Sequence, residues 1–118
     1  MTWWSKIWQR ALSSVTKQRV AAVEEVPIES MTRVEVDGEP ICLVHAEDDN
    51  FYAIGDTCTH EEYSLSEGEL WDMSVECPRH GSRFDVRTGK VTGLPAVIPA
   101  RTYPVTVENG EIFVEIEG

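Results

Sequence analysis

Two stretches decide the fold of this chain: Gly55-Asp56-Thr57-Cys58-Thr59-His60 and, further on, Cys77-Pro78-Arg79-His80-Gly81-Ser82-Arg83-Phe84. Sixteen residues separate His60 from Cys77. Thiolates and imidazoles are ligands for zinc and for iron–sulfur centres. Zinc fingers usually group a cysteine pair before a histidine pair. Here each stretch supplies one cysteine and then one histidine, so the cysteines can converge on one metal ion and the histidines on another.

Both stretches lie in a region of poor periodicity, residues 55–99, which contains five glycines. Its loops are too long for simple hairpins, and irregular loops rich in special residues are where sites tend to be built. We therefore expect the metal-binding loops between about residues 55 and 99.

On both sides of this region the sequence alternates as short β-strands do. The expected strands and turn signals are, in order, residues 32–36, Asp37-Gly38, residues 41–45, 51–54, 102–108, Asn109-Gly110 and residues 111–116. Asp-Gly and Asn-Gly favour two-residue hairpin turns. The pattern predicts an all-β fold, a sandwich or a barrel.

Length and composition indicate one globular domain. The chain has 118 residues, 42% of them hydrophobic and 26% charged, which is enough for one compact core. No apolar run approaches the roughly 20 residues of a membrane-spanning helix, so we expect no spanning segment and no membrane association other than the alternative given below for residues 1–23. The formal charge of −11 repels nucleic acid and favours basic or apolar protein partners. Three cysteines without a secretory signal argue against a disulfide framework and indicate the cytoplasm.

Residues 1–23 differ from the rest in charge. They contain four basic residues and no acidic one, whereas residues 24–118 contain six basic and 21 acidic residues, a net charge of −15. Trp4, Trp8, Leu12 and Val15 recur at helical spacing, so we expect a basic amphipathic helix over residues 1–23. This helix could pack on the acidic body or reflect the choice of start codon. It could also dock on a partner or an anionic membrane surface, or serve as a targeting peptide.

The ligand pattern resembles that of Rieske [2Fe–2S] proteins, in which two histidines replace two of the four cysteines. The resemblance covers residues 24–118, which we take as the Rieske domain. It implies the Rieske fold, with stacked antiparallel sheets and a small cluster-binding subdomain at one end. It also implies that Cys58 and Cys77 hold the inner iron of one [2Fe–2S] cluster, and that His60 and His80 hold the outer iron, which accepts the electron.

The resemblance further implies which residues surround the cluster. Residues 93–96 are similar to the proline-containing loop that covers the cluster in this family. Leu94 and Pro95 of this loop, together with Pro78, would form an apolar rim that keeps water from the cluster. Gly81 directly follows the second histidine, as the family pattern requires.

Four positions bear on the reduction potential. High-potential relatives carry a disulfide between the two loops, at the places where this chain has Tyr63 and Arg79. They also carry a tyrosine where this chain has Phe84, whereas Ser82 matches their serine that donates to a bridging sulfide. Rieske centres span roughly −150 to +300 mV, and we expect the lower half of that range.

The remaining residues give no sign of an active site. His45 is the one histidine left after the ligands are assigned, so the chain cannot build the mononuclear iron site of Rieske oxygenases, which needs two. Cys42 lies in an expected strand and behaves as a small apolar residue. Neither a dinucleotide-binding fingerprint nor a serine elbow occurs. We expect an electron carrier rather than an enzyme, without a small-molecule substrate.

As a small stand-alone Rieske domain, this chain resembles the ferredoxin components of bacterial multicomponent aromatic-ring-hydroxylating dioxygenases, carbazole dioxygenase among them. The resemblance implies transfer of single electrons from a flavin-containing NAD(P)H reductase to a terminal oxygenase. Within electron transfer, the alternatives are a nitrite-reductase small subunit and a protein associated with iron–sulfur assembly. From another class, Cys58, His60, Cys77 and His80 could hold one zinc ion in a structural interaction module.

Overall fold

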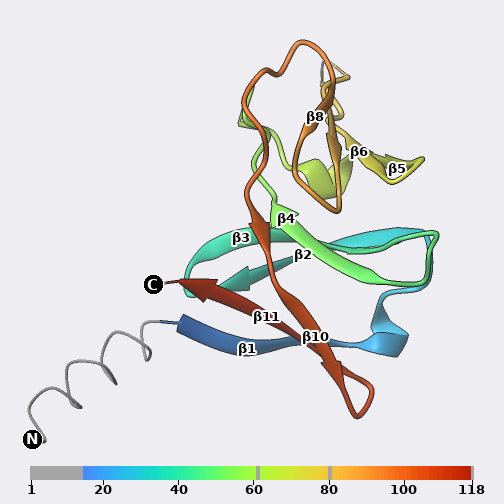
Figure 1. Cartoon of the computed structure of the whole chain (residues 1–118), viewed down its shortest axis with the longest axis vertical. Coiled ribbons are helices and arrows are strands. Elements are labelled where there is room, and N and C mark those ends of the chain that lie inside the picture. The colour runs from blue at the N-terminus through green and yellow to red at the C-terminus, as the bar shows by residue number, and fades with distance from the viewer. Residues whose placement is uncertain (1–14, 61, 80, 118) are drawn as a thin grey trace, which may run out of the picture.

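Three antiparallel sheets make up the part of the chain that the computed structural model describes, residues 15–60, 62–79 and 81–117. The strand orders are β1-β11-β10, β2-β3-β4-β9 and β5-β6-β7-β8. The third sheet forms a separate lobe at one end of the molecule, above the two larger sheets (Figure 1). This arrangement confirms the predicted all-β fold with stacked antiparallel sheets and a small subdomain.

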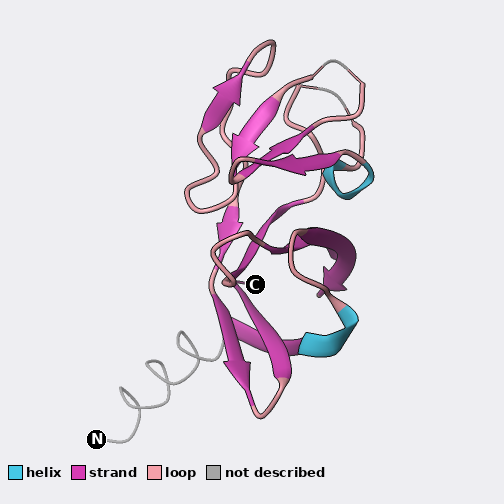
Figure 2. Cartoon of the chain, turned by 90° about the vertical axis from the view of Figure 1, so that its right-hand side faces the viewer, coloured by secondary structure: helices cyan, strands magenta, loops and turns pink. Residues whose placement is uncertain are grey.

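The elements are bounded as follows: β1 Val15–Ala22, η1 Val23–Glu25, β2 Ser30–Val36, β3 Glu39–His45, β4 Phe51–Gly55, η2 Leu65–Glu67, β5 Glu69–Trp71, β6 Ser74–Glu76, β7 Arg83–Asp85, β8 Val91–Gly93, β9 Thr102–Tyr103, β10 Val105–Glu108 and β11 Glu111–Glu117. The two η elements are single turns of 3-10 helix, one in each half of the molecule (Figure 2). Both expected hairpin turns are present, with φ of 52° and 82° at Asp37 and Gly38 and of 52° and 76° at Asn109 and Gly110. Positive φ at both central residues is the conformation that Asp-Gly and Asn-Gly favour.

The sheet β2-β3-β4-β9 separates two apolar cores. On β3, Cys42 and Val44 point into one core, whereas Ile41 and Leu43 point into the other. Because successive side chains of a strand point to opposite faces, a strand buried on both faces reads as a continuous apolar run. This explains why residues 41–45 are all buried.

The core on the side of the lobe combines residues of β3 and β4 with residues of the loops, including Cys58 and Cys77. The second core lies against the sheet β1-β11-β10 and contains Ile112, Val114 and Ile116 of β11. The lobe thus shares its core with the central sheet and does not stand alone.

The prediction of a helix was wrong for residues 15–22, which form strand β1. This strand pairs along β11, and its basic side chains meet acidic ones of the β10–β11 hairpin: Lys17 Nζ lies 2.8 Å from Glu108 Oε2 of β10, and Arg19 Nε lies 2.7 Å from Glu111 Oε1 of β11. Pairing with a hairpin of opposite charge outweighs a weak helical pattern, since tertiary pairing routinely overrides local propensity. Residues 1–14 of the predicted helix lie outside the described residues.

The alternating stretch 102–108 is two strands rather than one. β9 pairs with β4, and after Pro104 the chain continues as β10, which pairs with β11 in the other sheet. Proline has no N–H to donate to a ladder, so a strand that reaches it tends to leave its partner. This switch joins the two larger sheets.

Among the helices of the described residues, none is long and apolar enough to span a bilayer.

Candidate functional site

The first loop follows β4 and is organised around Asp56. This carboxylate is 2% exposed, accepts hydrogen bonds from the Ser64 hydroxyl and, at 2.9 Å, from the Ser66 N–H, and lies 3.4 Å from Arg33 Nε. The backbone of the loop closes on itself, because the Cys58 N–H donates to the Tyr63 carbonyl at 2.9 Å. A buried carboxylate that accepts several hydrogen bonds fixes the chain around it. The loop therefore holds Cys58 in a defined place.

The second loop connects β6 and β7 as the end of a hairpin. The Cys77 N–H donates to the Ser82 carbonyl at 2.7 Å, and the Gly81 N–H donates back to the Cys77 carbonyl at 3.3 Å. Gly81 has a φ of +78°, a conformation that side-chain-bearing residues rarely adopt. The glycine after the second histidine is thus required by the turn. His80 itself lies outside the described residues.

The two cysteines and the first histidine differ in burial. Cys58 and Cys77 are each 3% exposed and belong to one apolar cluster with Leu65, Val75 and Phe84. His60, two residues after Cys58, is exposed. The site therefore presents its sulfur atoms to the protein interior and an imidazole to the surface.

A third loop, between β8 and β9, closes over the other two. The Ala96 N–H donates to Ser82 Oγ at 3.1 Å, and the Thr59 hydroxyl donates to the Ile98 carbonyl at 2.6 Å. The first bond ties the third loop to the second, and the other ties it to the first. Because the Ser82 oxygen is the acceptor, its hydroxyl hydrogen can still donate to another group.

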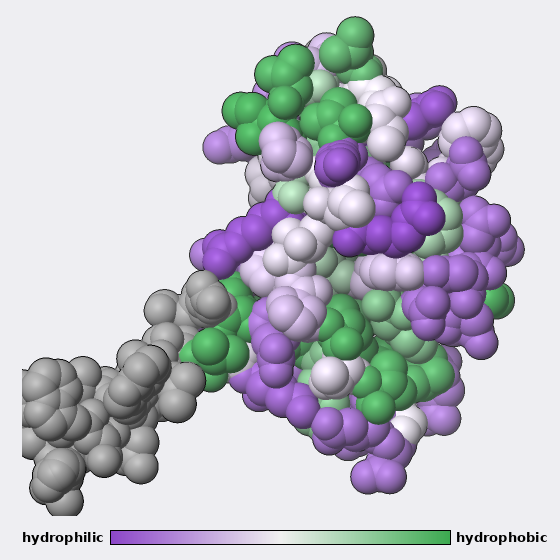
Figure 3. Space-filling model, viewed as in Figure 1, coloured by the Kyte–Doolittle hydropathy of each residue, from purple (hydrophilic) through white to green (hydrophobic). Residues whose placement is uncertain are grey.

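The third loop also carries the largest exposed apolar surface near the site. Leu94, Val97 and Ile98 are 75, 77 and 60% exposed, and Figure 3 shows hydrophobic surface gathered at this end of the molecule. Pro78 and Pro95 are exposed as well. The predicted rim residues Leu94, Pro95 and Pro78 therefore face solvent. Single exposed apolar residues are ordinary, but a contiguous patch marks a surface that contacts a partner.

The other residues predicted around the cluster are buried in the loops. Ser82 and Phe84 have no exposed surface, and Gly81 is half-buried. Phe84 packs with both cysteines in the same apolar cluster, which a phenylalanine can do without a hydrogen-bond partner. Tyr63 and Arg79 contact each other: the Arg79 guanidinium donates to the Tyr63 hydroxyl and lies 5.2 Å from the ring centroid.

Asp56, Thr59 and Ile98 have structural roles at the site that the sequence analysis did not assign. Thr59 and Ile98 are 39 positions apart in the chain, so no local pattern relates them. The apolar pair Val97-Ile98, directly before Pro99, is the sequence signal that could have indicated an exposed loop there.

Buried charge affects a neighbouring thiol. Burial raises the pKa of the Cys42 thiol, and the negative charge of Asp56 raises it further. Cys42 is therefore a neutral thiol next to the site, and its Sγ lies 3.7 Å from Met31 Sδ. His45 is also occupied elsewhere, since its ring nitrogens lie 2.8 Å from the Val26 carbonyl and 2.7 Å from Asp49 Oδ1.

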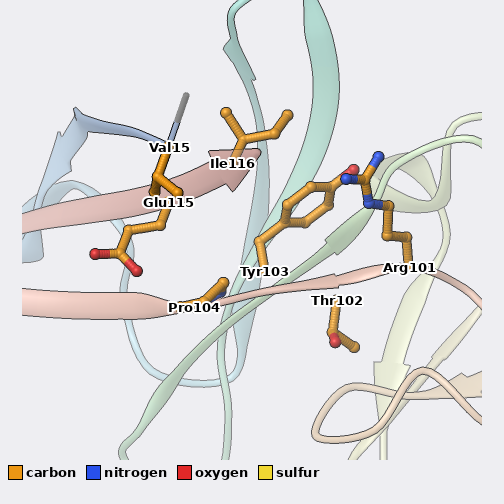
Figure 4. Close-up of a pocket in the computed structure, with 7 residues that line it drawn as sticks. All are labelled: Val15, Arg101, Thr102, Tyr103, Pro104, Glu115 and Ile116. Carbon is orange, nitrogen blue, oxygen red and sulfur yellow. The ribbon is translucent and has the colours of Figure 1, made fainter. Parts of the chain in front are cut away.

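In the described part of the chain, no three His, Cys, Asp or Glu side chains gather into a group that could hold a single metal ion. One cavity lies at the site and another lies away from it. One of about 360 Å³ is lined by Cys77, Pro78 and Arg79 together with Glu67, Glu69 and Glu76. Another of about 320 Å³ lies between the ends of β1 and β11 and the residues around β9, and Cys58, His60 and Cys77 do not line it (Figure 4).

Comparison with known proteins gives a consistent result. Residues 16–104 match the model of the Rieske [2Fe-2S] domain. The ferredoxin component of biphenyl 2,3-dioxygenase from Rhodococcus jostii is 47% identical over 90 residues, which is 75% of this chain and 81% of that protein.

Solved structures agree. The ferredoxin of carbazole 1,9a-dioxygenase from Nocardioides aromaticivorans is 40% identical with a TM-score of 0.80, over 84% of this chain and 96% of that one. A chain in a complex of reduced oxygenase and oxidized ferredoxin of carbazole 1,9a-dioxygenase is 38% identical with a TM-score of 0.78, over 82% of this chain and 99% of that one.

These matches decide between the two cofactors that the ligand pattern left open. The family and the ferredoxins among its members use a Rieske [2Fe–2S] cluster and not a single zinc ion. The relatives are electron carriers of multicomponent systems and not their catalytic subunits. The predicted fold, cofactor and absence of catalysis are thereby confirmed, and the chain belongs to the Rieske [2Fe–2S] family as one of its ferredoxins.

Proposed function

We propose that Cys58 and Cys77 hold the inner iron of the cluster and that His60 and His80 hold the outer iron. We further propose that the protein carries single electrons from a flavin-containing NAD(P)H reductase to a terminal aromatic-ring-hydroxylating oxygenase in the cytoplasm. The observation that supports this most is the difference in burial between the sulfur and imidazole ligands: the two cysteines are 3% exposed, and His60 is exposed.

The donor chemistry fits the cluster. Soft thiolates and imidazoles are the ligand types of a Rieske centre, with two protein ligands on each iron. A thiolate in an apolar core needs a metal to offset the loss of hydration, and Cys58 and Cys77 are in such a core. When bound, the cluster accepts and releases one electron, and its histidine ligands make reduction easier than four thiolates would.

The residues of the chain supply insulation, orientation and contact. Leu65, Val75 and Phe84 keep water from the thiolate side, since all three have no exposed surface. Ser82 would donate to the cluster through its hydroxyl hydrogen, while Phe84 has no hydroxyl to add a second donor. With one such donor in place of two, we expect a reduction potential in the lower half of the Rieske range.

The surface around His60 is suited to a short-lived complex. Leu94, Val97 and Ile98 offer an apolar contact that excludes water where the partner docks. Residues 24–118 carry a net charge of −15 and attract a basic partner over a distance. Salt screens this attraction, so the complex weakens as the ionic strength rises. A related ferredoxin is described in complex with its oxygenase, which supports an oxygenase as the electron acceptor.

The test replaces one proposed ligand and one cysteine that is not a ligand. Cys58→Ser should leave the anaerobically purified protein without its visible cluster absorption and without NADH-dependent product formation in a reconstituted reductase–oxygenase assay. Cys42→Ala is the matched control, because Cys42 is equally buried and should keep both. Full cluster content in the Cys58→Ser variant, or its loss in Cys42→Ala, would contradict the ligand assignment. A loaded protein that fails to reduce any ring-hydroxylating oxygenase would contradict the partner.

A further inference from the structure

We propose that Tyr63 and Arg79 are a positioning pair, a clamp between the two ligand loops that retains the cluster and tunes its potential. This inference rests on the ligand assignment proposed above. Tyr63 lies five residues after Cys58, and Arg79 lies two residues after Cys77 and directly before His80. The pair therefore joins the two loops at their ligands.

The clamp acts on the first cysteine through the backbone of Tyr63. The Tyr63 carbonyl accepts a hydrogen bond from the Cys58 N–H at 2.9 Å. The Tyr63 hydroxyl accepts a hydrogen bond from the Arg79 guanidinium, which also lies over the tyrosine ring. One residue thus holds the backbone of Cys58 and the second loop at the same time. A guanidinium over an aromatic ring combines a cation–π attraction with a hydrogen bond, so it fixes both distance and orientation.

Two other contacts complete a ring around the site. Ser82 and Ala96 join the second loop to the third, and Thr59 and Ile98 join the third to the first. Both of these contacts use a backbone group. The Tyr63–Arg79 contact is formed by two side chains at the surface, so substitution can remove it without disturbing a buried group.

The lobe needs such a contact because its own ladders are short. Strands β5 to β8 have three residues each, and β7 and β8 share two register pairs. Two or three ladder positions leave the loop ends free to separate unless side chains join them. The guanidinium also places a fixed positive charge beside the ligands, and this charge favours the reduced, more negative form.

Cluster retention is the first measurement. The holoprotein variants Tyr63→Leu and Arg79→Gln should each lose visible absorption to an excess of ferrous chelator about tenfold faster than the wild type, as expected for one cation–π contact with one hydrogen bond. The double variant should be no faster than the singles, since each removes the same contact. Arg101→Gln is the matched control, because the Arg101 guanidinium makes the same kind of contact, 5.2 Å from the centroid of the Tyr103 ring, and neither residue belongs to the two ligand loops (Figure 4).

The midpoint potential separates clamping from charge. Arg79→Lys keeps the positive charge and should keep the potential, yet it should lose the cluster faster because an ammonium lacks the planar fork. Arg79→Gln should lower the potential. Tyr63→Phe keeps the ring and should lie between the wild type and Tyr63→Leu in its rate of loss.

Several results would overturn the clamp. The clamp is contradicted if Tyr63→Leu and Arg79→Gln lose the cluster at the rate of the wild type. It is also contradicted if the accelerations of the two variants multiply in the double variant, or if Arg101→Gln loses the cluster as fast as they do. A variant that purifies folded but without cluster, while Arg101→Gln is loaded, supports it. Failure of the ligand assignment is seen separately, as a normal cluster in Cys58→Ser.

Discussion

The two larger sheets and the ligand-bearing lobe are stabilised in different ways. In the larger sheets, β1 with β11 and β2 with β3 each form ladders of seven register pairs. In the lobe, β5 with β6 and β6 with β7 form ladders of three. The lobe compensates with single contacts between loops, such as Ser82 with Ala96 and Thr59 with Ile98. Stability that is spread over many contacts tolerates the loss of one, whereas a loop held by single contacts does not.

The largest expected effect is at Gly68 in the lobe. A Cβ at this position would lie 1.8 Å from the Glu76 carbonyl oxygen and 3.2 Å from Pro78 Cδ, so Gly68→Ala forces the strand before Cys77 to move. Rigid backbone on one side leaves little room to relax, and overpacking of this kind is strongly destabilising. We expect the purified variant to lose most of its iron and labile sulfide, measured per chain.

Gly55→Ala is the matched control for that substitution. Gly55 precedes the first ligand loop, and a Cβ there would have no atom within 4 Å. Alanine costs less backbone entropy than glycine in a strand, so this variant should keep its cluster and its stability. Iron content that falls equally in both variants would mean that the close approach at Gly68 is not the cause.

The next effect is in the core of the larger sheets. Ile112 on β11 has no exposed surface, and Ile112→Ala should lower the free energy of unfolding by about 3 kcal/mol through lost burial and a residual cavity. Its cluster absorption and midpoint potential should remain those of the wild type, because the central sheet separates this core from the ligands. Urea unfolding followed by circular dichroism gives the first quantity, and redox titration gives the second.

The exposed Val107 on the neighbouring strand β10 supplies the control, because it is 48% exposed and Val107→Ala should change stability little. A shifted potential in Ile112→Ala would show that the two regions are coupled more closely than the two separate cores suggest.

Sequence reasoning succeeded where a local signal decides the structure. Asp37-Gly38 and Asn109-Gly110 take the backbone that their residue types favour, and the alternating runs beside them are strands. The spacing of Cys58, His60, Cys77 and His80 predicted the family, because few folds require that pattern. The burial of Cys58 and Cys77 in one core agrees with it.

It failed where distant partners decide. Residues 15–22 are a strand because β11 offers them a complementary edge nearly a hundred positions away. Residues 102–108 divide at Pro104 because two different sheets compete for them. The hydrogen bond between Thr59 and Ile98 likewise depends on how two loops pack together, and the sequence pattern of neither loop predicts this contact.

The smallest expected effect concerns Cys42, at the boundary between the two regions. Burial, with a contribution from Asp56, raises the pKa of its thiol above the ordinary value of 9.0. Below that value both the folded and the unfolded chain keep the proton, so stability does not depend on this group. Above it the unfolded chain loses the proton and the folded chain does not, so stability falls as pH rises, by up to about 1.4 kcal/mol per pH unit.

Cys42→Ala should therefore show a shallower decline than the wild type between about pH 9 and pH 10.5 in urea unfolding. The buried Tyr103, whose pKa is also raised by burial, is present in both proteins and cancels in the comparison. Identical slopes would place the Cys42 thiol in contact with water, and the apolar core beneath the ligand loops would then be less closed than its burial indicates.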